Sequence, residues 1–197
     1  MPITADRSVR AVRSRRARPA GRSDAASSLP ELTGLPPIAG TDARILILGS
    51  MPGAASLRAG QYYAHPRNAF WPIVSALLGL PADQGYPERT AALQAHRIAL
   101  WDVLATCRRR SSLDSDIDQN TVRLNDFVAF FAAHPDIERV YCNGGTAAAT
   151  FERRIAPMLP SGRKLELHRL PSTSPAYAVL GMAAKLAAWR AIVLERS

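Results

Sequence analysis

The chain has 197 residues, with 25 lysines and arginines against 16 aspartates and glutamates, a formal net charge of +9. This length fits one domain with a full hydrophobic core, and the basic excess favours a polyanionic partner such as nucleic acid. The two cysteines, Cys107 and Cys142, are too few for a thiolate-only zinc site or an iron–sulfur cluster, and no apolar run approaches the roughly 20 residues that span a bilayer. We expect a reduced, metal-free protein that is neither exported nor inserted in a membrane.

The first 30 residues differ in composition from the rest of the chain. They contain seven arginines and two aspartates, together with alanine, serine and proline but few large apolar residues. Such a segment buries too little apolar surface to offset the entropy of ordering, so we predict a disordered Arg-rich tail over 1–30 and a globular domain over 31–197. The tail fits a solvated extension or misplaced start codon, an arm that grips DNA phosphates, or an organelle transit peptide.

From residue 31 onward, short apolar runs alternate with longer amphipathic segments. Apolar runs that end in polar or glycine-rich turns predict strands over 44–49, 97–103, 139–144 and 164–170. Helical periodicity predicts helices over 69–79, about 87–95, 123–133, 145–157 and 178–195. Strands separated by helices need crossover connections, which predicts an α/β three-layer sandwich with a four-stranded, mainly parallel sheet flanked by helices.

In such sheets, ligands bind beyond the carboxyl ends of the strands. The segments that follow the four predicted strands are therefore the candidate site, and they comprise 49–53, 101–107, 143–145 and 170–177. The glycines of 143–145 lead into a helix whose N-terminus offers N–H groups to a phosphate, although tight packing of the turn explains them equally well.

The long loop over 49–71 is unusually polar and aromatic. Gly49, Pro52 and Gly53 are turn-forming residues, and a glycine lets the backbone approach a ligand closely. Asn68 directly precedes a segment whose apolar residues fall on one helical face, and asparagine is a preferred N-cap. Spacing alone therefore predicts that Asn68 caps the helix over 69–79, a role compatible with a place in the site.

A series of motifs carries a resemblance to a known family. In chain order they read GSMPGAASL (49–57), YYAHPRNAFW (62–71), LWDV (100–103), SSLDSDI (111–117) and LPSTSPA (170–176). The pattern resembles the uracil-DNA glycosylase superfamily, most closely its hypoxanthine-DNA glycosylase branch, and HPRNAFW is also similar to mismatch-specific thymine and uracil glycosylases. The resemblance implies a four-stranded parallel sheet, no cofactor, and hydrolysis of the N-glycosidic bond of a base flipped out of DNA.

The resemblance also implies which residues form the site. It maps the catalytic asparagine of the branch onto Asn68 and the substrate contacts onto the motif residues Gly49, Ser50, Met51, Pro52, Gly53, Tyr63, Phe70, Asp102, Ser172, Thr173 and Ser174. Tyr63 and Phe70 are the candidates for stacking on the flipped base, against the alternative that their rings only pack in the core. The loop over 170–176 is predicted to contact phosphates and press into the duplex, against the alternative of a structural Ser/Pro turn.

Asp102 ends the second predicted strand, at the position where typical uracil glycosylases have their base-reading asparagine. Deamination converts a ring-nitrogen acceptor of adenine or cytosine into an N–H donor, and an ionised carboxylate only accepts. Asp102 is therefore predicted to select hypoxanthine or uracil over the parent bases. The alternative is an aspartate whose carboxylate is satisfied by backbone N–H groups at a strand or helix end.

The chain departs from the family pattern at several positions. Ser50 and Met51 stand where typical uracil glycosylases have an aspartate and mismatch enzymes an asparagine, so no water-orienting group is expected there. The segment 172–174 replaces a histidine, and Tyr177 stands where the branch more often has asparagine. We therefore expect slow chemistry that relies on a carboxamide, backbone N–H groups and the substrate's own phosphates. The arginine run over 108–110 is predicted to face DNA.

These features together predict a DNA glycosylase that acts on deaminated bases in double-stranded DNA, hypoxanthine first and uracil second, with single-stranded DNA as a further candidate substrate. It is predicted to be monofunctional because no lysine lies in any motif to start a lyase step. We expect a monomer without metal or other cofactor, cytoplasmic and associated with the nucleoid. The alternatives are a G/U mismatch-specific uracil-DNA glycosylase, a non-catalytic DNA-binding protein of the same fold, and a hydrolase of free nucleosides.

Overall fold

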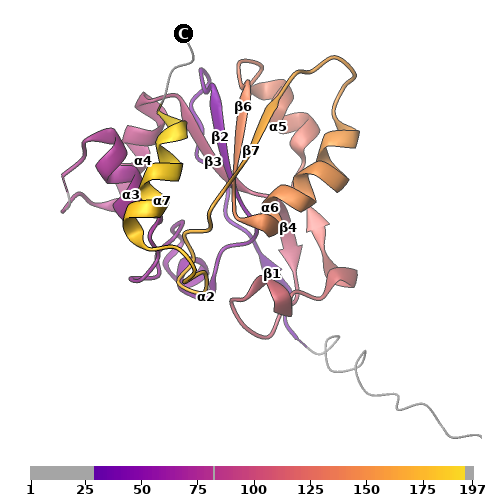
Figure 1. Ribbon diagram of the computed structural model, residues 1–197. Coiled ribbons are helices and arrows are strands. Elements are labelled where there is room, and N and C mark those ends of the chain that lie inside the picture. Colours follow the sequence, from indigo (N-terminus) through magenta and orange to yellow (C-terminus); the bar gives the residue numbers. More distant parts are fainter. Residues whose placement is uncertain (1–28, 82, 194–197) are drawn as a thin grey trace, which may run out of the picture.

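A four-stranded parallel sheet forms the centre of the protein (Figure 1). The computed structural model describes residues 29–81 and 83–193. The strand order is β3 (Ile98–Asp102), β2 (Ile45–Gly49), β6 (Arg139–Asn143) and β7 (Glu166–Leu170). All three strand pairs are parallel, so the carboxyl ends of the strands share one edge, where Gly49 pairs with Asp102 and Asn143 with Leu170. The predicted four-stranded parallel sheet is confirmed.

Burial explains the apolar character of these strands. β2 and β3 are buried along their whole length, as expected for strands that are covered on both faces. β6 is buried in its three middle residues, whereas β7, at the edge of the sheet, is buried only at Leu170. The sheet therefore contributes its most apolar strands to the core and ends in a half-exposed edge.

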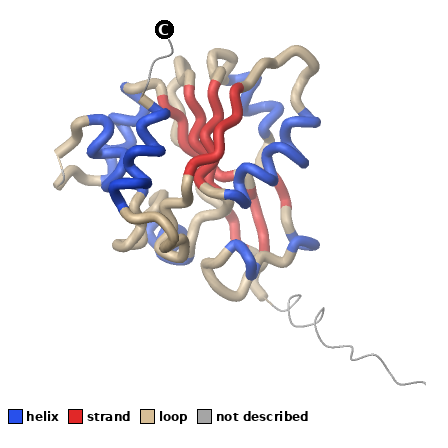
Figure 2. The backbone as a smooth tube through the Cα atoms, in the orientation of Figure 1, coloured by secondary structure: helices blue, strands red, loops and turns tan. Residues whose placement is uncertain are grey.

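Helices cover both faces of this sheet, as Figure 2 shows. One face carries α3 (Phe70–Leu78), α4 (Tyr86–Ala95) and α7 (Met182–Trp189), and the other carries α5 (Phe127–Ala133) and α6 (Gly145–Thr150). Trp189 packs edge-on against Phe70 with ring centroids 5.7 Å apart and joins α7 to α3. The predicted α/β three-layer sandwich is confirmed.

A second, three-stranded antiparallel sheet was not predicted. Its order is β1 (Leu32–Thr33), β4 (Leu104–Cys107) and β5 (Arg123–Leu124). The strand predicted over 97–103 ends at Asp102, and the chain enters β4 after Val103. Because β5 occupies the start of the helix predicted over 123–133, that helix begins only at Phe127. Strands of two residues are too short for an alternating pattern to reveal them.

The remaining predicted helices differ in length or type. The helix predicted over 145–157 is α-helical only to Thr150, and the one predicted over 178–195 begins at Met182. The loop after β2 contains a short helix that the sequence did not indicate. The short helical elements are α2 (Ala54–Ala59), the 3-10 turns η1 (Asp114–Asp116), η2 (Gln119–Thr121), η4 (Ala156–Met158) and η5 (Arg190–Ile192), and the π turn η3 (Phe151–Ile155).

The predicted tail over 1–30 lies, apart from its last two residues, outside the described residues and stays a prediction. Within the described ranges, no helix combines the length and the apolar character needed to cross a membrane.

Candidate active site

A cavity of about 670 Å³ lies at the carboxyl edge of the central sheet. Its walls come from segments that follow all four strands: 49–56 after β2, Asp102 at the end of β3, 143–146 after β6, and 172–177 after β7. Parts of 62–68 and 112–115 complete it. Ligands of parallel sheets bind at this edge, and the volume is typical of small-molecule pockets. The four segments that were distant in sequence thus form one candidate site.

Eleven of the twelve predicted site residues line this cavity, and Phe70 is the exception. The eleven are Asn68, Gly49, Ser50, Met51, Pro52, Gly53, Tyr63, Asp102, Ser172, Thr173 and Ser174. The Phe70 side chain is fully buried, and its ring stacks on that of Tyr63 with centroids 4.0 Å apart. The packing alternative therefore describes Phe70, which supports Tyr63 from behind instead of facing the cavity.

The Asp102 carboxyl is buried in the wall of the cavity, with 3% of the residue exposed. Its Oδ2 atom is buried without a hydrogen-bond partner in the described part of the chain. Burial raises the pKa of Asp102 to about 7, the negative charge of Asp114 adds to the rise, and Arg109 opposes it. The alternative for Asp102, a carboxylate whose oxygens accept from backbone N–H groups, is therefore not observed at Oδ2.

Gly49 lets Asp102 and Tyr63 approach the end of β2. A Cβ atom on Gly49 would lie 2.1 Å from Asp102 Oδ1 and 2.9 Å from the Tyr63 hydroxyl, so any side chain here would displace both groups. Tyr63 has φ of 54°, a left-handed conformation that is costly for an aromatic residue. Its hydroxyl is buried, and no hydrogen bond of normal geometry reaches it from the residues described. Burial and the nearby Asp102 raise the Tyr63 pKa, and an interaction with the Asn143 side chain opposes this rise.

Asn68 connects the cavity to the start of α3. Its Oδ1 accepts a hydrogen bond from the Phe70 N–H at 2.9 Å, although the residue at the N-cap position itself is Ala69. The capping interaction expected of Asn68 is thus present, one residue earlier than a standard N-cap. Because Oδ1 faces the helix, the Nδ2 group, which has no hydrogen bond to a residue in the described ranges, remains available as a donor in the cavity.

The wall formed by β6 and the loop after β7 is held by reciprocal hydrogen bonds. Asn143 Nδ2 donates to Thr173 Oγ1 at 2.8 Å, and the Thr173 N–H donates to Asn143 Oδ1 at 2.9 Å. The Ala69 N–H donates to the Thr173 carbonyl at 3.0 Å and joins this loop to the start of α3. The sequence analysis included Asn143 in the candidate segment 143–145 but gave a role only to the glycines beside it and none to its carboxamide.

The serines beside Thr173 stabilise the same loop. Ser172 Oγ accepts from the Ser174 N–H, and Ser174 Oγ accepts from the Ala176 N–H, both at 3.2 Å. The backbone of Gly144 has φ of 101°, and a Cβ atom there would lie 3.1 Å from Ser172 Cβ. These local bonds are those of the structural turn that was the alternative for this segment, and the same hydroxyls line the cavity.

A carboxylate reaches the end of β2 from another loop. The Ser50 hydroxyl donates to Asp114 Oδ1 at 2.7 Å, and both residues line the cavity. Sequence reasoning included Asp114 in a motif without giving it a role, because nothing in the sequence joins residues 64 positions apart. We expected no water-orienting group at the end of this strand, and Ser50 and Met51 carry no carboxylate, yet Asp114 brings one to the same place in the cavity.

The arginine run over 108–110 does not face solvent as a unit. Arg109 is buried, and its Nη2 donates to the Pro52 carbonyl, so it supports the loop after β2. Arg110 is exposed and Arg108 is half-buried. The prediction that this run faces DNA is therefore wrong for Arg109, since the loop needs a donor beneath Pro52.

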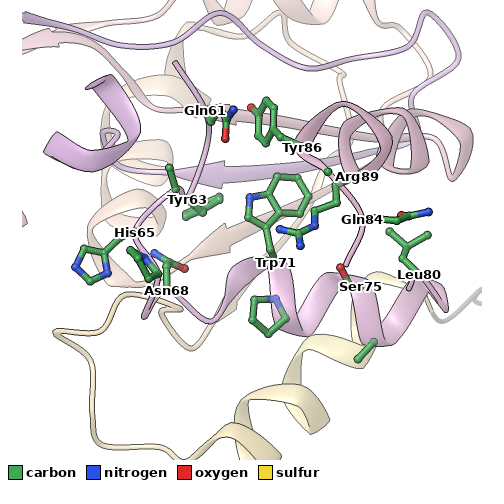
Figure 3. Close-up of a pocket in the computed structure, with 15 residues that line it drawn as sticks. Gln61, Tyr63, His65, Asn68, Trp71, Ser75, Leu80, Gln84, Tyr86 and Arg89 are labelled. Atoms are coloured by element: carbon green, nitrogen blue, oxygen red, sulfur yellow. The ribbon is translucent and has the colours of Figure 1, made fainter. Parts of the chain in front are cut away.

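A second cavity of about 780 Å³ shares Tyr63, His65 and Asn68 with the first one. Figure 3 shows His65 and Asn68 together at one end of it and Trp71 with Arg89 near its middle, between α3 and α4. The Trp71 indole N–H donates to the Tyr62 carbonyl at 2.8 Å and fixes the segment between the two cavities. The segment 61–68 is therefore a thin wall that both cavities share.

The described residues contain no cluster of three or more histidine, cysteine or acidic side chains able to hold a metal ion. Cys107 and Cys142 are both buried, and both are free cysteines that form no disulfide with each other.

Comparisons with known proteins place this fold and site in a family. The model of the uracil DNA glycosylase superfamily matches residues 36–195. A hypoxanthine DNA glycosylase of Methanosarcina acetivorans is 36% identical over 144 residues, which cover 73% of this chain and 86% of that protein. A hypoxanthine DNA glycosylase of Methanosarcina barkeri is 36% identical over 112 residues, 56% of this chain and 70% of that protein.

A solved structure agrees. The solution NMR structure of a Methanosarcina acetivorans protein assigned as a uracil DNA glycosylase matches with a TM-score of 0.68 and 31% identity, over 84% of this chain and all of that one. The fold and the site thus define an enzyme of the DNA glycosylase class. The chain belongs to the uracil DNA glycosylase superfamily, as its motifs predicted.

Proposed function

We propose that this protein is a monofunctional DNA glycosylase that releases hypoxanthine, and secondarily uracil, from double-stranded DNA for base excision repair. The Asp102 carboxyl carries the proposal, because its Oδ2 is buried in the cavity wall without a partner from the described residues. A buried acceptor is destabilising unless a ligand supplies the donor. Hypoxanthine and uracil carry a ring N–H where their parent bases adenine and cytosine carry an acceptor, so they satisfy Asp102 where the parent bases do not.

The other cavity residues take complementary roles in this proposal. Tyr63, supported by the stacked Phe70 ring, offers an aromatic face to the flipped base. The Asn68 carboxamide donates from Nδ2 toward the water or the charge that develops as the glycosidic bond lengthens. The backbone over 49–53 follows the sugar closely because Gly49 has no side chain.

The two lysines of the chain support a monofunctional enzyme. Lys164 is exposed and does not line the cavity. Lys185 is buried, and its Nζ donates to the Tyr177 carbonyl at 2.8 Å while lying 5.4 Å from the Tyr177 ring. Its amine is therefore occupied in holding the cavity rim and is not free to attack the sugar.

The rim of the cavity has the features of a DNA contact. Arg67 is exposed there and offers a positive charge to a phosphate. Beyond Tyr177 the chain presents the apolar side chains of Val179, 81% exposed, and Met182, 49% exposed. Exposed apolar side chains beside a pocket are suited to fill the space that an extruded base leaves in the duplex. We infer that double-stranded DNA is the main substrate and single-stranded DNA a second one. We further infer that the enzyme acts as a monomer on the nucleoid in the cytoplasm.

The test is release of base under single-turnover conditions from duplexes that carry one deoxyinosine or one deoxyuridine opposite each normal base, followed by alkaline cleavage. We expect strand breaks with deoxyinosine to form fastest, and none with deoxyadenosine or deoxycytidine. Free inosine serves as the control substrate and should stay intact. Activity on uracil only, and only opposite guanine, would instead identify a mismatch-specific enzyme. Tight DNA binding without breaks would identify a non-catalytic protein.

A further inference from the structure

The loop that contains η1 brings one carboxylate to the end of β2. Asp114 is the first residue of η1 and the only one of its three residues that is not exposed. Its Oδ1 accepts the 2.7 Å hydrogen bond from Ser50, the residue that directly follows β2. Asp114 therefore lies at the edge of the cavity beside the end of β2, where the next two residues along the chain are a serine and a methionine.

Contacts other than Ser50 hold this loop in place. The Ala54 N–H donates to Ser112 Oγ at 3.0 Å, and Ile117 is buried where it pairs with Arg109. Arg109 in turn donates to the Pro52 carbonyl. The η1 loop and the loop after β2 thus form one docked unit, which gives the Asp114 carboxylate a defined position before any ligand binds.

The second oxygen of Asp114 is available for a ligand. Oδ2 has no hydrogen bond to any residue within 29–81 or 83–193, and Asp114 lines the same cavity as Asn68 and Asp102. The negative charge of Asp114 acts across this cavity, since it raises the pKa of both Asp102 and Tyr63. The Asp114 carboxylate therefore lies close to Asp102, the base-reading group, and to Tyr63, the stacking group, but is separate from both.

We propose that Asp114 is a catalytic residue of this glycosylase, whose free carboxylate oxygen binds the attacking water and whose charge stabilises the sugar cation. The inference rests on the proposed function. In the step, the C1′–N bond breaks and its electron pair leaves with the base, while the water oxygen forms a bond to C1′. The water gives its proton to Asp114, and the leaving base takes a proton from solvent.

This assignment separates three polar groups by what each is able to do. Asp102 lies in the wall where it accepts from the base. The Asn68 carboxamide is neutral, so it orients a water but neither takes its proton nor balances a positive charge. Asp114 supplies both of these functions, and Ser50 holds it as a positioning residue.

The test is single-turnover excision of hypoxanthine from a duplex by the full-length protein, with duplex binding and stability measured in parallel. Asp114→Asn keeps the size of the side chain and an acceptor for Ser50 but removes the charge and the base. We expect the rate of excision to fall by ~100-fold or more, the scale of losing one preorganised polar group, while the Kd for the deoxyinosine duplex stays close to that of the unmodified protein. Asp116→Asn is the matched control, because Asp116 lies in the same turn, is exposed and accepts a hydrogen bond from the nearby Ser111, so the rate of this variant should equal that of the unmodified protein.

Ser50→Ala gives a second measurement that does not depend on the stability of Asp114→Asn. It leaves the charge in place and removes one hydrogen bond, so we expect the rate of excision to fall about tenfold, the scale of one hydrogen bond, with duplex binding unchanged. An unchanged rate in Asp114→Asn, or in Ser50→Ala should Asp114→Asn not fold, would overturn the inference while the proposed function stands. So would a large loss of rate accompanied by an equal weakening of duplex binding or by a loss of stability, since it would make Asp114 a structural support. Failure of the unmodified protein on every deoxyinosine and deoxyuridine duplex would overturn the proposed function instead.

Discussion

The two walls of the cavity treat their polar groups in opposite ways. In the wall from β6 and the loop after β7, Asn143 and Thr173 exchange two hydrogen bonds, and the Thr173 carbonyl accepts a third from Ala69. In the wall from β2 and β3, Asp102 Oδ2 is buried without a hydrogen-bond partner from the part of the chain that is described. The first wall satisfies its buried polar groups before any ligand binds, whereas the second leaves a buried carboxylate oxygen unpaired.

This difference indicates which wall is scaffold and which one binds. A buried polar atom without a partner costs about 1–3 kcal/mol, so an unpaired wall lowers the stability of the unliganded protein. Such a cost is usual where a site is prepared for a ligand. The paired wall fixes the loop over 172–177 and the start of α3, and the unpaired wall offers its groups to the base. Substitutions in the two walls should therefore have different effects on activity and on stability.

The largest effect on the rate of excision should come from filling the space beside Gly49 in the unpaired wall. Gly49→Ala would place a Cβ atom 2.1 Å from Asp102 Oδ1, which forces Asp102 and Tyr63 away from the base. Misplacement of about 1 Å costs ~100-fold in rate, so we expect the single-turnover rate to fall by at least that factor. Gly53→Ala is the matched control, because the nearest atom to its new Cβ lies 3.6 Å away, an ordinary contact. Equal rates for the two variants would show that the close approach at Gly49 has no role.

Asn68 lies where the two walls meet, and its two roles have different chemical requirements. Asn68→Ser keeps an oxygen that accepts from the Phe70 N–H, so the free energy of unfolding should change by less than ~1 kcal/mol. It loses the Nδ2 donor, so the single-turnover rate on deoxyinosine should fall by ~100-fold. Asn68→Asp should also preserve the helix start while failing on hypoxanthine. A normal rate in a folded Asn68→Ser would leave Asn68 with a purely structural role.

The central sheet and most of the residues that line the cavity could be predicted from the sequence, for identifiable physical reasons. The central strands are continuous apolar runs because both faces are covered, and parallel strands bring their carboxyl ends to one edge. The pairings of Ser50 with Asp114 and of Asn143 with Thr173 could not be predicted, because polar side chains far apart in sequence show no shared pattern. The position of Phe70 was ambiguous, since an aromatic ring on an apolar helical face suits either the core or a base.

Breaking the paired wall should reduce stability more than chemistry. Asn143→Ala removes both hydrogen bonds to Thr173, whose N–H and hydroxyl are then buried without partners, since only 1% of Thr173 is exposed. We expect the free energy of unfolding to fall by about 2–3 kcal/mol, measured by urea denaturation. Asn143→Asp is the control that keeps the Oδ1 acceptor for the Thr173 N–H and should lose less. A larger loss of stability at Asp102→Ala than at Asn143→Ala would reverse the assignment of the two walls.

The smallest effect, and the one that identifies the unpaired wall most directly, is a pH dependence of stability. Because the pKa of Asp102 is raised to about 7, the folded protein holds this proton more tightly than the unfolded chain does. Between the ordinary carboxyl pKa near 4 and pH 7, the unfolded chain therefore loses the proton first, and stability falls as pH rises. Asp102→Asn has no proton to lose, so it should be more stable than the parent at pH 8 and differ little from it at pH 4. Equal slopes for Asp102→Asn and the parent protein would mean that the Asp102 carboxyl meets a partner in solution, and the contrast between the two walls would then be lost.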